Sequence, residues 1–403
     1  MTVLFVNWEG PNTRYLESLF LPLLTGALRG GDQLRVLHFG WDQAHREDEA
    51  KRLAAKAGVD LRFVSVWRRP LGPATLASVG RGALAVASEV RRHRVDVVMP
   101  RSNLCAGMAL GARRLAPPAG LLYDADGLMA DERADFGGWS RDGKAYRLLR
   151  AFEDRAVAQA DAVVTRTEWA VGVLAERAGR DLGGRAFVVS NGRDPNVFAP
   201  GMESDRSRTR QELGVALAAP LLVYAGSMGP QYRVGDMIAL FSAVCRRRPD
   251  ARFLLLTGEP DLARPLVEAS GVGGAAIVRR VPPLEVPRYL AAADVGLALR
   301  TPFFSQRAVA PVKIAEYLLC GVPTVASAGI GEGVAVEGVG FLVAGGRGDW
   351  MELAADWIIS DVISKREAYR GRARARGVER FSLDRSTSEY RRAFDAVRPA
   401  HSN

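Results

Sequence analysis

The clearest combination of residues for binding a phosphate-bearing ligand lies in segment 311–325, where Lys313 and Glu316 are three positions apart. In a helix this spacing puts both side chains on one face, close to the helix start. The free N–H groups and positive dipole end of a helix attract a diphosphate, and a carboxylate accepts hydrogen bonds from sugar hydroxyls. The same spacing is typical of a surface Lys–Glu pair on an ordinary crossover helix, so the pattern alone leaves both interpretations open.

Three residues predict where this helix begins and ends. Pro311 suits a first helical position, where its missing N–H is harmless. Gly321 suits the left-handed position just past a helix end, and Pro323 prevents the helix from continuing. We therefore expect a helix over residues 311–320 that leads directly into a strand at 324–326.

A glycine-containing turn at 224–233 is a second candidate, because it follows an apolar stretch and precedes a helical pattern. Gly226 allows the backbone to approach a phosphate closely, Ser227 lies beside it, and Arg233 supplies a positive charge. Standing alone, the two glycines of this stretch are better explained by a plain tight turn.

Two carboxylates, Asp124 and Asp126, follow the apolar stretch 121–123. They lie at the expected carboxyl end of a strand, which is where clefts form in parallel sheets. Because they are two positions apart, the two side chains need not face the same site. The alternative is an Asp-rich loop that caps the next helix.

The elements that position these residues are short apolar stretches alternating with longer amphipathic ones, a pattern that indicates parallel sheets covered on both faces. Thirteen predicted strands exceed what one open sheet usually carries, and a turn-rich segment at 190–200 divides the chain. We predict an α/β fold with two doubly wound, Rossmann-like domains, roughly 1–196 and 200–380, facing each other across a cleft. A last helix at about 382–397 is expected to cross back to the first domain. The predicted strands are 3–7, 34–39, 61–66, 95–99, 121–123, 162–165, 187–190, 221–225, 252–257, 276–279, 295–299, 324–326 and 340–343.

Composition narrows the class of protein. The 403 residues are 48% hydrophobic and 25% charged, as in soluble globular proteins, and no apolar run is long enough to span a bilayer. The three cysteines are too few and too widely spaced for a disulfide framework, which suits a reducing cytoplasm. The four histidines are not at metal-ligand spacing, and the N-terminus resembles a first strand more than a signal peptide.

The formal net charge of +10 favours anionic partners. The most basic stretch, 365–380, lacks the interleaved aromatic residues that stack on bases, so no nucleic-acid partner is expected. Two interpretations of the charge stay open: peripheral contact with the inner membrane surface, and an arginine-rich surface that is simply solvated.

Segment 308–325 resembles the donor site of the retaining GT-B glycosyltransferases of the large family four, also called glycosyl transferases group 1. Its members carry two glutamates separated by seven residues, followed by a Gly-x-Pro turn. Glu316 corresponds to the second glutamate, which holds the nucleotide ribose in that family, and Ala308 stands where the first one contacts the donor sugar. In the glycine turn, Ser227 occupies the place of a common arginine, and Arg233 lies near a second basic residue that holds the diphosphate.

Further stretches extend this resemblance over residues 123–326. Asp126 replaces a basic residue of a family motif in the first domain, and residues 153–167 match the helix and strand that end that domain. Val281 begins a segment whose loop backbone reads the nucleobase in the family. Gly10 follows the first strand, where family members use glycine loops to approach the donor.

The resemblance implies a retaining glycosyltransferase that moves a hexose-type sugar from a UDP- or GDP-sugar to an acceptor hydroxyl, with no cofactor and no metal. Asp126 would orient the sugar or the acceptor, which is a glycan, a lipid-linked glycan or a secondary metabolite. Three other classes stay open: a nucleotide-sugar epimerase or hydrolase on the same scaffold, a non-catalytic nucleotide-sugar-binding protein, and a basic protein that binds membranes or nucleic acid. The residues expected to contact the donor are Glu316, Lys313, Arg233, Gly226, Ser227, Pro311, Val281 and Gly10.

Overall fold

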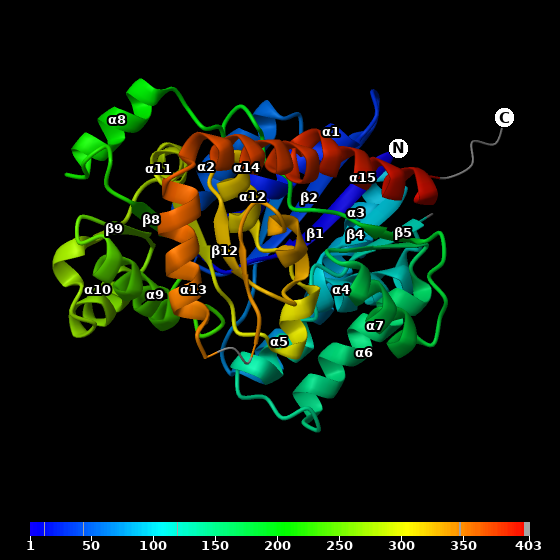
Figure 1. The fold of residues 1–403 in the computed structure, drawn as a ribbon. Helices are drawn as coiled ribbons and strands as arrows, with labels where there is room; N and C mark the ends of the chain where they lie inside the picture. The colour runs from blue at the N-terminus through cyan, green and yellow to red at the C-terminus, as the bar shows by residue number, and fades with distance from the viewer. Residues whose placement is uncertain (12, 43, 119, 346–347, 399–403) are drawn as a thin grey trace. The chain divides into compact units, whose positions relative to one another are not determined.

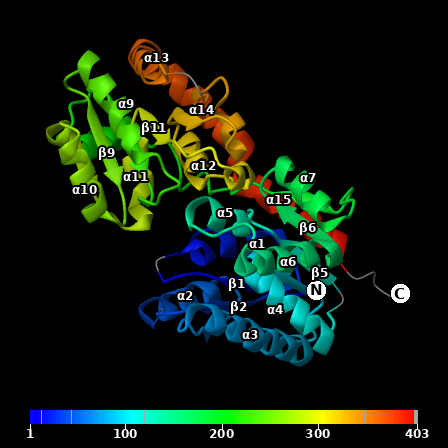
Figure 2. The ribbon, with the colours of Figure 1, turned by 90° about the horizontal axis from the view of Figure 1, so that it is seen from below.

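The computed structural model describes residues 1–11, 13–42, 44–118, 120–345 and 348–398. The chain divides into unit 1, which comprises Met1–Ser190 and Ser386–Asn403, and unit 2, which comprises Asn191–Arg385. Asn191, the first residue of unit 2, donates a side-chain hydrogen bond of 2.8 Å to the carbonyl of Ala310 in the same unit. Each unit has its own parallel sheet with helices around it (Figures 1 and 2).

Unit 1 is built on a sheet of seven parallel strands in the order β3-β2-β1-β4-β5-β6-β7, as far as the chain is described. The direction of winding reverses between β1 and β4, and ligands bind beside such a reversal in doubly wound sheets. All seven strands overlap the ones predicted for the first half of the chain. They are β1 (Thr2–Trp8), β2 (Gln33–Gly40), β3 (Asp60–Ser65), β4 (Val97–Pro100), β5 (Gly120–Asp124), β6 (Ala162–Thr165) and β7 (Ala186–Val188).

Helices surround the unit 1 sheet. Helix α3 packs against α4, and α4 packs against α6 (Figure 2). Helix α15 lies beside α1, where a Cβ on Gly26 would come within 3.1 Å of Thr387, so the two helices approach closely at this glycine. The helices are η1 (Leu16–Phe20), α1 (Leu21–Ala27), α2 (Ala44–Lys56), α3 (Leu71–His93), α4 (Ser102–Leu115), α5 (Met129–Phe136), α6 (Lys144–Gln159), α7 (Glu168–Ala178) and α15 (Leu383–Val397).

Unit 2 repeats the plan with six parallel strands in the order β10-β9-β8-β11-β12-β13, again as far as the chain is described. Here the winding reverses between β8 and β11. The strands, which also overlap the predicted ones, are β8 (Leu221–Ala225), β9 (Arg252–Leu256), β10 (Ala276–Arg279), β11 (Val295–Ala298), β12 (Thr324–Ser327) and β13 (Phe341–Val343). The helices are α8 (Glu203–Glu212), α9 (Val234–Arg247), α10 (Pro260–Ala269), η2 (Gly273–Ala275), η3 (Pro283–Glu285), α11 (Val286–Ala292), η4 (Phe304–Ala308), α12 (Val312–Leu319), η5 (Gly331–Val336), α13 (Trp350–Asp356), η6 (Trp357–Ile363) and α14 (Arg366–Phe381).

The two faces of the unit 2 sheet bury separate cores, because side chains alternate along each strand. Leu221 and Val223 join the core that α11, α12 and α14 cover, whereas Leu222 and Tyr224 join the core that α9, α10 and α13 cover. Burial on both faces explains why the central strands β8 and β11 are apolar throughout. The predicted α/β class with two doubly wound units is confirmed. Among the helices of the described ranges, none combines the length and apolar character needed to cross a bilayer.

Candidate functional site

The carboxyl edge of the unit 2 sheet brings together the loops that follow β8 and β11, the two strands between which the winding reverses. The loops meet through an antiparallel bridge between Tyr232 and Arg300. Helix α12 begins beside them, after the segment that follows β11. The sequence stretches 224–233 and 311–320 are therefore adjacent, at the place where doubly wound sheets bind ligands.

Helix α12 has nearly the predicted limits. It begins at Val312 with Pro311 as the residue just before it (φ −66°), one position later than expected, and it ends at Leu319. Gly321 has φ +72°, the left-handed conformation expected after a helix end. These local signals were sufficient because capping depends on residues that are neighbours in the chain.

Lys313 points from the first turn of α12 into the protein and is 8% exposed. Its ammonium Nζ lies 4.2 Å from the ring centre of Tyr224 and 4.0 Å from that of Tyr232. No hydrogen-bond partner for Nζ exists among the residues that the structure describes. The side chain is therefore no surface partner of Glu316, and the interpretation of 313 and 316 as a solvated ion pair fails.

The electrostatic setting of Lys313 disfavours its charge. Burial lowers the pKa of Lys313 well below its usual range, the nearby Arg300 guanidinium lowers it further, and Glu316 opposes the shift. Two tyrosine rings offer the ammonium a favourable quadrupole, which does not replace a hydrogen-bonding anion. The site thus contains a positive group that a bound anion would stabilise.

Gly226 lies against the ammonium group of Lys313. Its φ is +154°, and a Cβ there would lie 2.8 Å from Nζ of Lys313 and 3.1 Å from the hydroxyl of Tyr224. A side chain at 226 would displace the lysine, so this turn requires glycine for both backbone conformation and space. The loop is held in place because the Tyr224 hydroxyl donates to the carbonyl of Ser227 and Glu259 accepts from the Met228 N–H at 2.7 Å.

Glu316 lies one turn further along α12 and keeps 16% of its side chain exposed. Its carboxylate accepts a hydrogen bond of 3.0 Å from Nε of Arg193. Ala308, at the position of the glutamate missing from the family pattern, ends η4 and is completely buried. Val281 follows β10 at the same edge of the sheet and is half-buried against the core under α11, α12 and α14.

Arg233 precedes α9, and its guanidinium is engaged locally. Its Nε donates a hydrogen bond of 2.5 Å to Asp236, and its charge lies 5.5 Å from the ring centre of Trp350. The arginine next to Lys313 is Arg300, whose guanidinium lies over the ring of Tyr232. The structure thus places the sequence-predicted arginine beside an acidic partner and a second, unpredicted arginine beside the lysine.

Asp126, the predicted catalytic residue, belongs to unit 1 and adopts a left-handed conformation with φ +60°. Its carboxylate accepts a hydrogen bond of 2.5 Å from Arg101, which follows β4, and lies 3.5 Å from Nε of Arg166. Asp124 is completely buried and binds Arg166 and the hydroxyl of Tyr390. The two aspartates thus have different roles: Asp124 anchors α15 to the sheet edge, and Asp126 keeps part of its carboxylate exposed.

Gly10 lies in unit 1 after β1, where a Cβ would come within 3.3 Å of the ring of Trp41. The adjacent Glu9 is buried in an ion pair with Arg46 at 3.0 Å. Burial raises the pKa of Glu9, and the Arg101 and Arg46 guanidiniums oppose that shift. Gly10 therefore permits close packing with an aromatic ring inside unit 1.

Three residues of the candidate site were not predicted from the sequence: Arg101, Arg193 and Arg300. Arg101 and Arg300 share a signal, since each follows the fourth strand of its unit, directly beside the reversal of winding. That signal becomes usable only when the strand order is known. Arg193 follows the Asn-Gly pair of the inter-unit segment and has no motif of its own.

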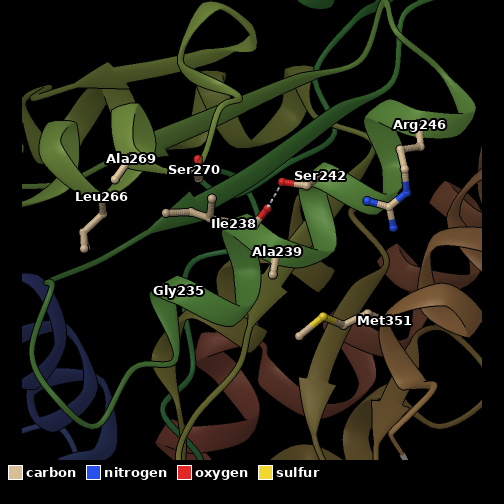
Figure 3. A pocket seen from close by; sticks show the side chains of 9 residues that line it. All are labelled: Gly235, Ile238, Ala239, Ser242, Arg246, Leu266, Ala269, Ser270 and Met351. Carbon is tan, nitrogen blue, oxygen red and sulfur yellow. Dashed lines mark hydrogen bonds between the residues drawn. The ribbon is translucent and has the colours of Figure 1, made fainter.

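A surface hollow of about 500 Å³ lies elsewhere in unit 2 (Figure 3). One face of α9 forms its floor, from Gly235 to Arg246, and Leu266 of α10 and Met351 of α13 flank it. None of the sequence-predicted site residues lines this hollow. In the parts of the chain that the structure describes, no cluster of three or more His, Cys, Asp or Glu side chains has the arrangement of a metal site.

Comparison with known proteins identifies relatives of unit 2 in sequence and of the whole chain in fold. Residues 219–361 match the family model of glycosyl transferases group 1. The structure of Anabaena HepE in complex with UDP-glucose is 20% identical, with a TM-score of 0.72 over 97% of this chain and 98% of that one. Sucrose-phosphate synthase from Thermosynechococcus elongatus is 15% identical, with a TM-score of 0.72 over 98% and 99%. WaaG, a glycosyltransferase involved in lipopolysaccharide biosynthesis, is 18% identical, with a TM-score of 0.69 over 97% and 99%.

These structural relatives share the GT-B fold with this chain, which confirms the predicted architecture. At such low identities the likeness concerns the fold, and the family match in unit 2 is independent of it. No curated protein sequence matches the chain significantly.

Proposed function

We propose that this chain is a glycosyltransferase, since residues 219–361 of unit 2 match the family model of glycosyl transferases group 1. In this proposal it transfers a hexose-type sugar from a UDP- or GDP-sugar to an acceptor hydroxyl. The structural relative HepE has been solved with UDP-glucose, which supports a nucleotide sugar as the donor. As the acceptor we propose a glycan, a lipid-linked glycan or a secondary metabolite.

The observation that carries this proposal is the unpartnered ammonium of Lys313 at the carboxyl edge of the unit 2 sheet. A buried cation without an anion costs free energy, and a diphosphate placed at the Gly226 turn would recover it. Glycine at 226 leaves the backbone open to such a ligand. The start of α12 adds its dipole and its free N–H groups.

In this proposal each group of the site acts on a defined part of the donor. Glu316 accepts hydrogen bonds from the ribose hydroxyls, since an ionised carboxylate only accepts. Lys313 and the start of α12 stabilise the negative charge that develops on the leaving diphosphate. Pro311, Ser227 and Val281 shape the surfaces around the diphosphate and the base.

We propose that the reaction proceeds with retention of the anomeric configuration. The bond between the anomeric carbon and the diphosphate oxygen breaks, and the acceptor oxygen bonds to that carbon from the same face. The departing phosphate oxygen takes the acceptor proton, so charge and atoms balance without a protein nucleophile. Asp126 orients the sugar or the acceptor through its partly exposed carboxylate. These groups act without a metal ion, and turnover is expected to persist in EDTA.

Thermal unfolding with a panel of UDP- and GDP-sugars tests donor binding. The matching nucleotide sugar is expected to raise the melting temperature, because a ligand that binds only the folded state stabilises it. Glu316→Ala should remove most of this shift. If no nucleotide sugar raises the melting temperature of the unaltered chain, the proposed function is wrong.

A turnover assay separates transfer from the alternatives. Release of UDP or GDP only in the presence of an acceptor, with a product of retained configuration by NMR, supports transfer. Release without any acceptor identifies a hydrolase, and donor binding without turnover over a broad acceptor panel identifies a non-catalytic binder.

A further inference from the structure

The unit 2 site contains two positive groups without a bound anion, and the second of them, after Lys313, is the guanidinium of Arg300. The described part of the chain contains eight buried arginines. Six of them are within ion-pairing distance of a carboxylate, and Arg370 donates to two backbone carbonyls. Arg300 has neither. The six paired arginines are Arg46, Arg101, Arg166, Arg193, Arg206 and Arg210.

The backbone of Arg300 is held firmly. Its N–H donates to the hydroxyl of Ser327 at 2.9 Å, and its carbonyl accepts from that same hydroxyl at 2.9 Å. The bridge to Tyr232 fixes it from the other side. The position of this side chain is therefore set by β8, β11 and β12 together, which suits a group that must meet a ligand in a defined geometry.

The guanidinium of Arg300 is only partly used by the protein. Its Nε donates to the amide oxygen of Gln306 at 2.6 Å, and its Cζ lies 4.9 Å from the ring centre of Tyr232. The four N–H groups on its two Nη atoms have no partner within the described ranges. A planar fork of free donors matches two phosphate oxygens.

Arg300 and Lys313 are neighbouring cations, since both lie over the ring of Tyr232 and the guanidinium disfavours the charge on the lysine. Two adjacent positive groups without an anion repel each other in a buried setting. A ligand with one negative charge would leave one of them uncompensated. A diphosphate supplies a charge for each.

We propose that Arg300 supplies the second positive charge that binds the donor diphosphate, next to Lys313, and that Arg233 does not. Arg233 is already neutralised by Asp236 at 2.5 Å, so a ligand would have to break that pair to recruit it. This proposal rests on the proposed donor site and names the residue that completes it. The fork of Arg300 then binds the phosphate oxygens bidentately, and Lys313 acts as a point charge.

The test compares single variants of the full chain in the binding of UDP and of uridine, which lacks the diphosphate. Arg300→Gln removes the fork but keeps a polar side chain, and Arg233→Gln removes the alternative arginine. Arg264→Gln is the matched control for the loss of one positive charge, because Arg264 is exposed on α10 and pairs with Asp261. UDP affinity is measured by titration calorimetry, and uridine binding by ligand-observed NMR.

Arg300→Gln is expected to weaken UDP binding about 10- to 100-fold, as the loss of charge-assisted hydrogen bonds does. Its uridine binding should stay within about twofold, because only the diphosphate contacts the guanidinium. Arg300→Lys should recover part of the affinity, since it restores the charge without the fork. Arg233→Gln and Arg264→Gln should each change UDP affinity by less than about threefold.

Two results would overturn the proposal. In the first, Arg300→Gln binds UDP with the affinity of the unaltered chain. In the second, Arg300→Gln loses UDP and uridine binding equally, which indicates a distorted site. A large loss in Arg233→Gln with none in Arg300→Gln would reassign the contact to Arg233. These outcomes differ from failure of the proposed function, in which the unaltered chain binds neither UDP nor GDP. A GDP–guanosine pair replaces UDP and uridine if the unaltered chain prefers guanine.

Discussion

Replacing Lys313 by methionine should change protein stability and ligand affinity in opposite directions. Methionine has a similar length and is apolar, so it fits among the rings of Tyr224 and Tyr232 without carrying a charge. The native ammonium is buried with no hydrogen-bond partner in the described part of the chain. Its removal relieves the cost of an unsatisfied buried group, about 1–3 kcal/mol.

The ligand-free Lys313→Met variant should therefore unfold with a free energy about 1–3 kcal/mol higher than that of the unaltered chain. UDP binding should weaken, because a hydrogen bond to a charged group contributes about 1.5–3 kcal/mol. That range corresponds to about a 10- to 150-fold increase in Kd. Urea unfolding without ligand and calorimetric titration with UDP measure the two effects separately.

The pH dependence follows from the lowered pKa of Lys313 in the folded state. The unfolded chain binds the proton more tightly, so the lysine's destabilising effect is complete below its folded pKa. That effect declines as pH rises from the folded pKa to the ordinary lysine value. The stability gain of Lys313→Met over the unaltered chain should therefore decline over the same pH range. A diphosphate favours the charged lysine, so UDP binding above the folded pKa should take up a proton.

Calorimetry in two buffers of different ionisation enthalpy detects this uptake, which should vanish in Lys313→Met. If the variant is less stable than the unaltered chain and binds UDP with unchanged affinity, the lysine is a structural residue and the reasoning fails.

Four further predictions concern other parts of the molecule. Gly226→Ala should lower UDP affinity at least tenfold and stability by about 1–3 kcal/mol, because the new Cβ would lie 2.8 Å from Nζ of Lys313 on a backbone with φ +154°. An unchanged UDP affinity by calorimetry would exclude close approach of the ligand at this turn. Glu316→Gln keeps a hydrogen-bond acceptor for Arg193 and should fold normally, yet lose most of the thermal shift that UDP-sugars cause; a retained shift would argue against the ribose contact. Asp126→Asn, which tolerates the left-handed conformation, should reduce turnover at least tenfold and leave UDP affinity within twofold, and equal turnover would remove Asp126 from the proposed mechanism. Burial raises the pKa of Glu153 to about 8, so between the ordinary glutamate pKa and pH 8 the folded state binds more protons than the unfolded state. The free energy of unfolding should therefore fall by about 1.4 kcal/mol for each pH unit of increase in that range. Urea unfolding of Glu153→Gln should show no such slope, and an unchanged slope would assign it to another group.

The sequence alone determined the strands and the shape of the donor-site helix. Central strands such as β4 and β11 are buried on both faces and contain only apolar residues, which made them easy to recognise. The partly exposed strands β3, β7 and β10 were still recognisable, because each contains a short stretch rich in apolar residues. Gly321 and Pro323 act through the conformation of their own backbone, so the end of α12 could be predicted without any knowledge of distant residues. Local chemistry also singled out Lys313 and Glu316, although it could not distinguish a surface pair from a binding site.

Tertiary structure decided how the charges are paired. Lys313 and Glu316 were predicted to lie on one face of the helix. In the structure the Lys313 ammonium lies over the rings of Tyr224 and Tyr232, whereas Glu316 accepts a hydrogen bond from Arg193. These contacts join residues far apart in sequence, and no local pattern encodes them.

Strand order likewise decided which arginine accompanies the lysine. Arg233 and Arg300 both lie near glycine or proline residues that predict loops, so the sequence does not distinguish between them. Only the pairing of β8 with β11 puts Arg300 beside Tyr232, while Asp236, one helical turn along α9, neutralises Arg233. The physical reason is that the free energy of a charge depends on its burial and on its nearest counter-ion, and both are properties of the folded chain.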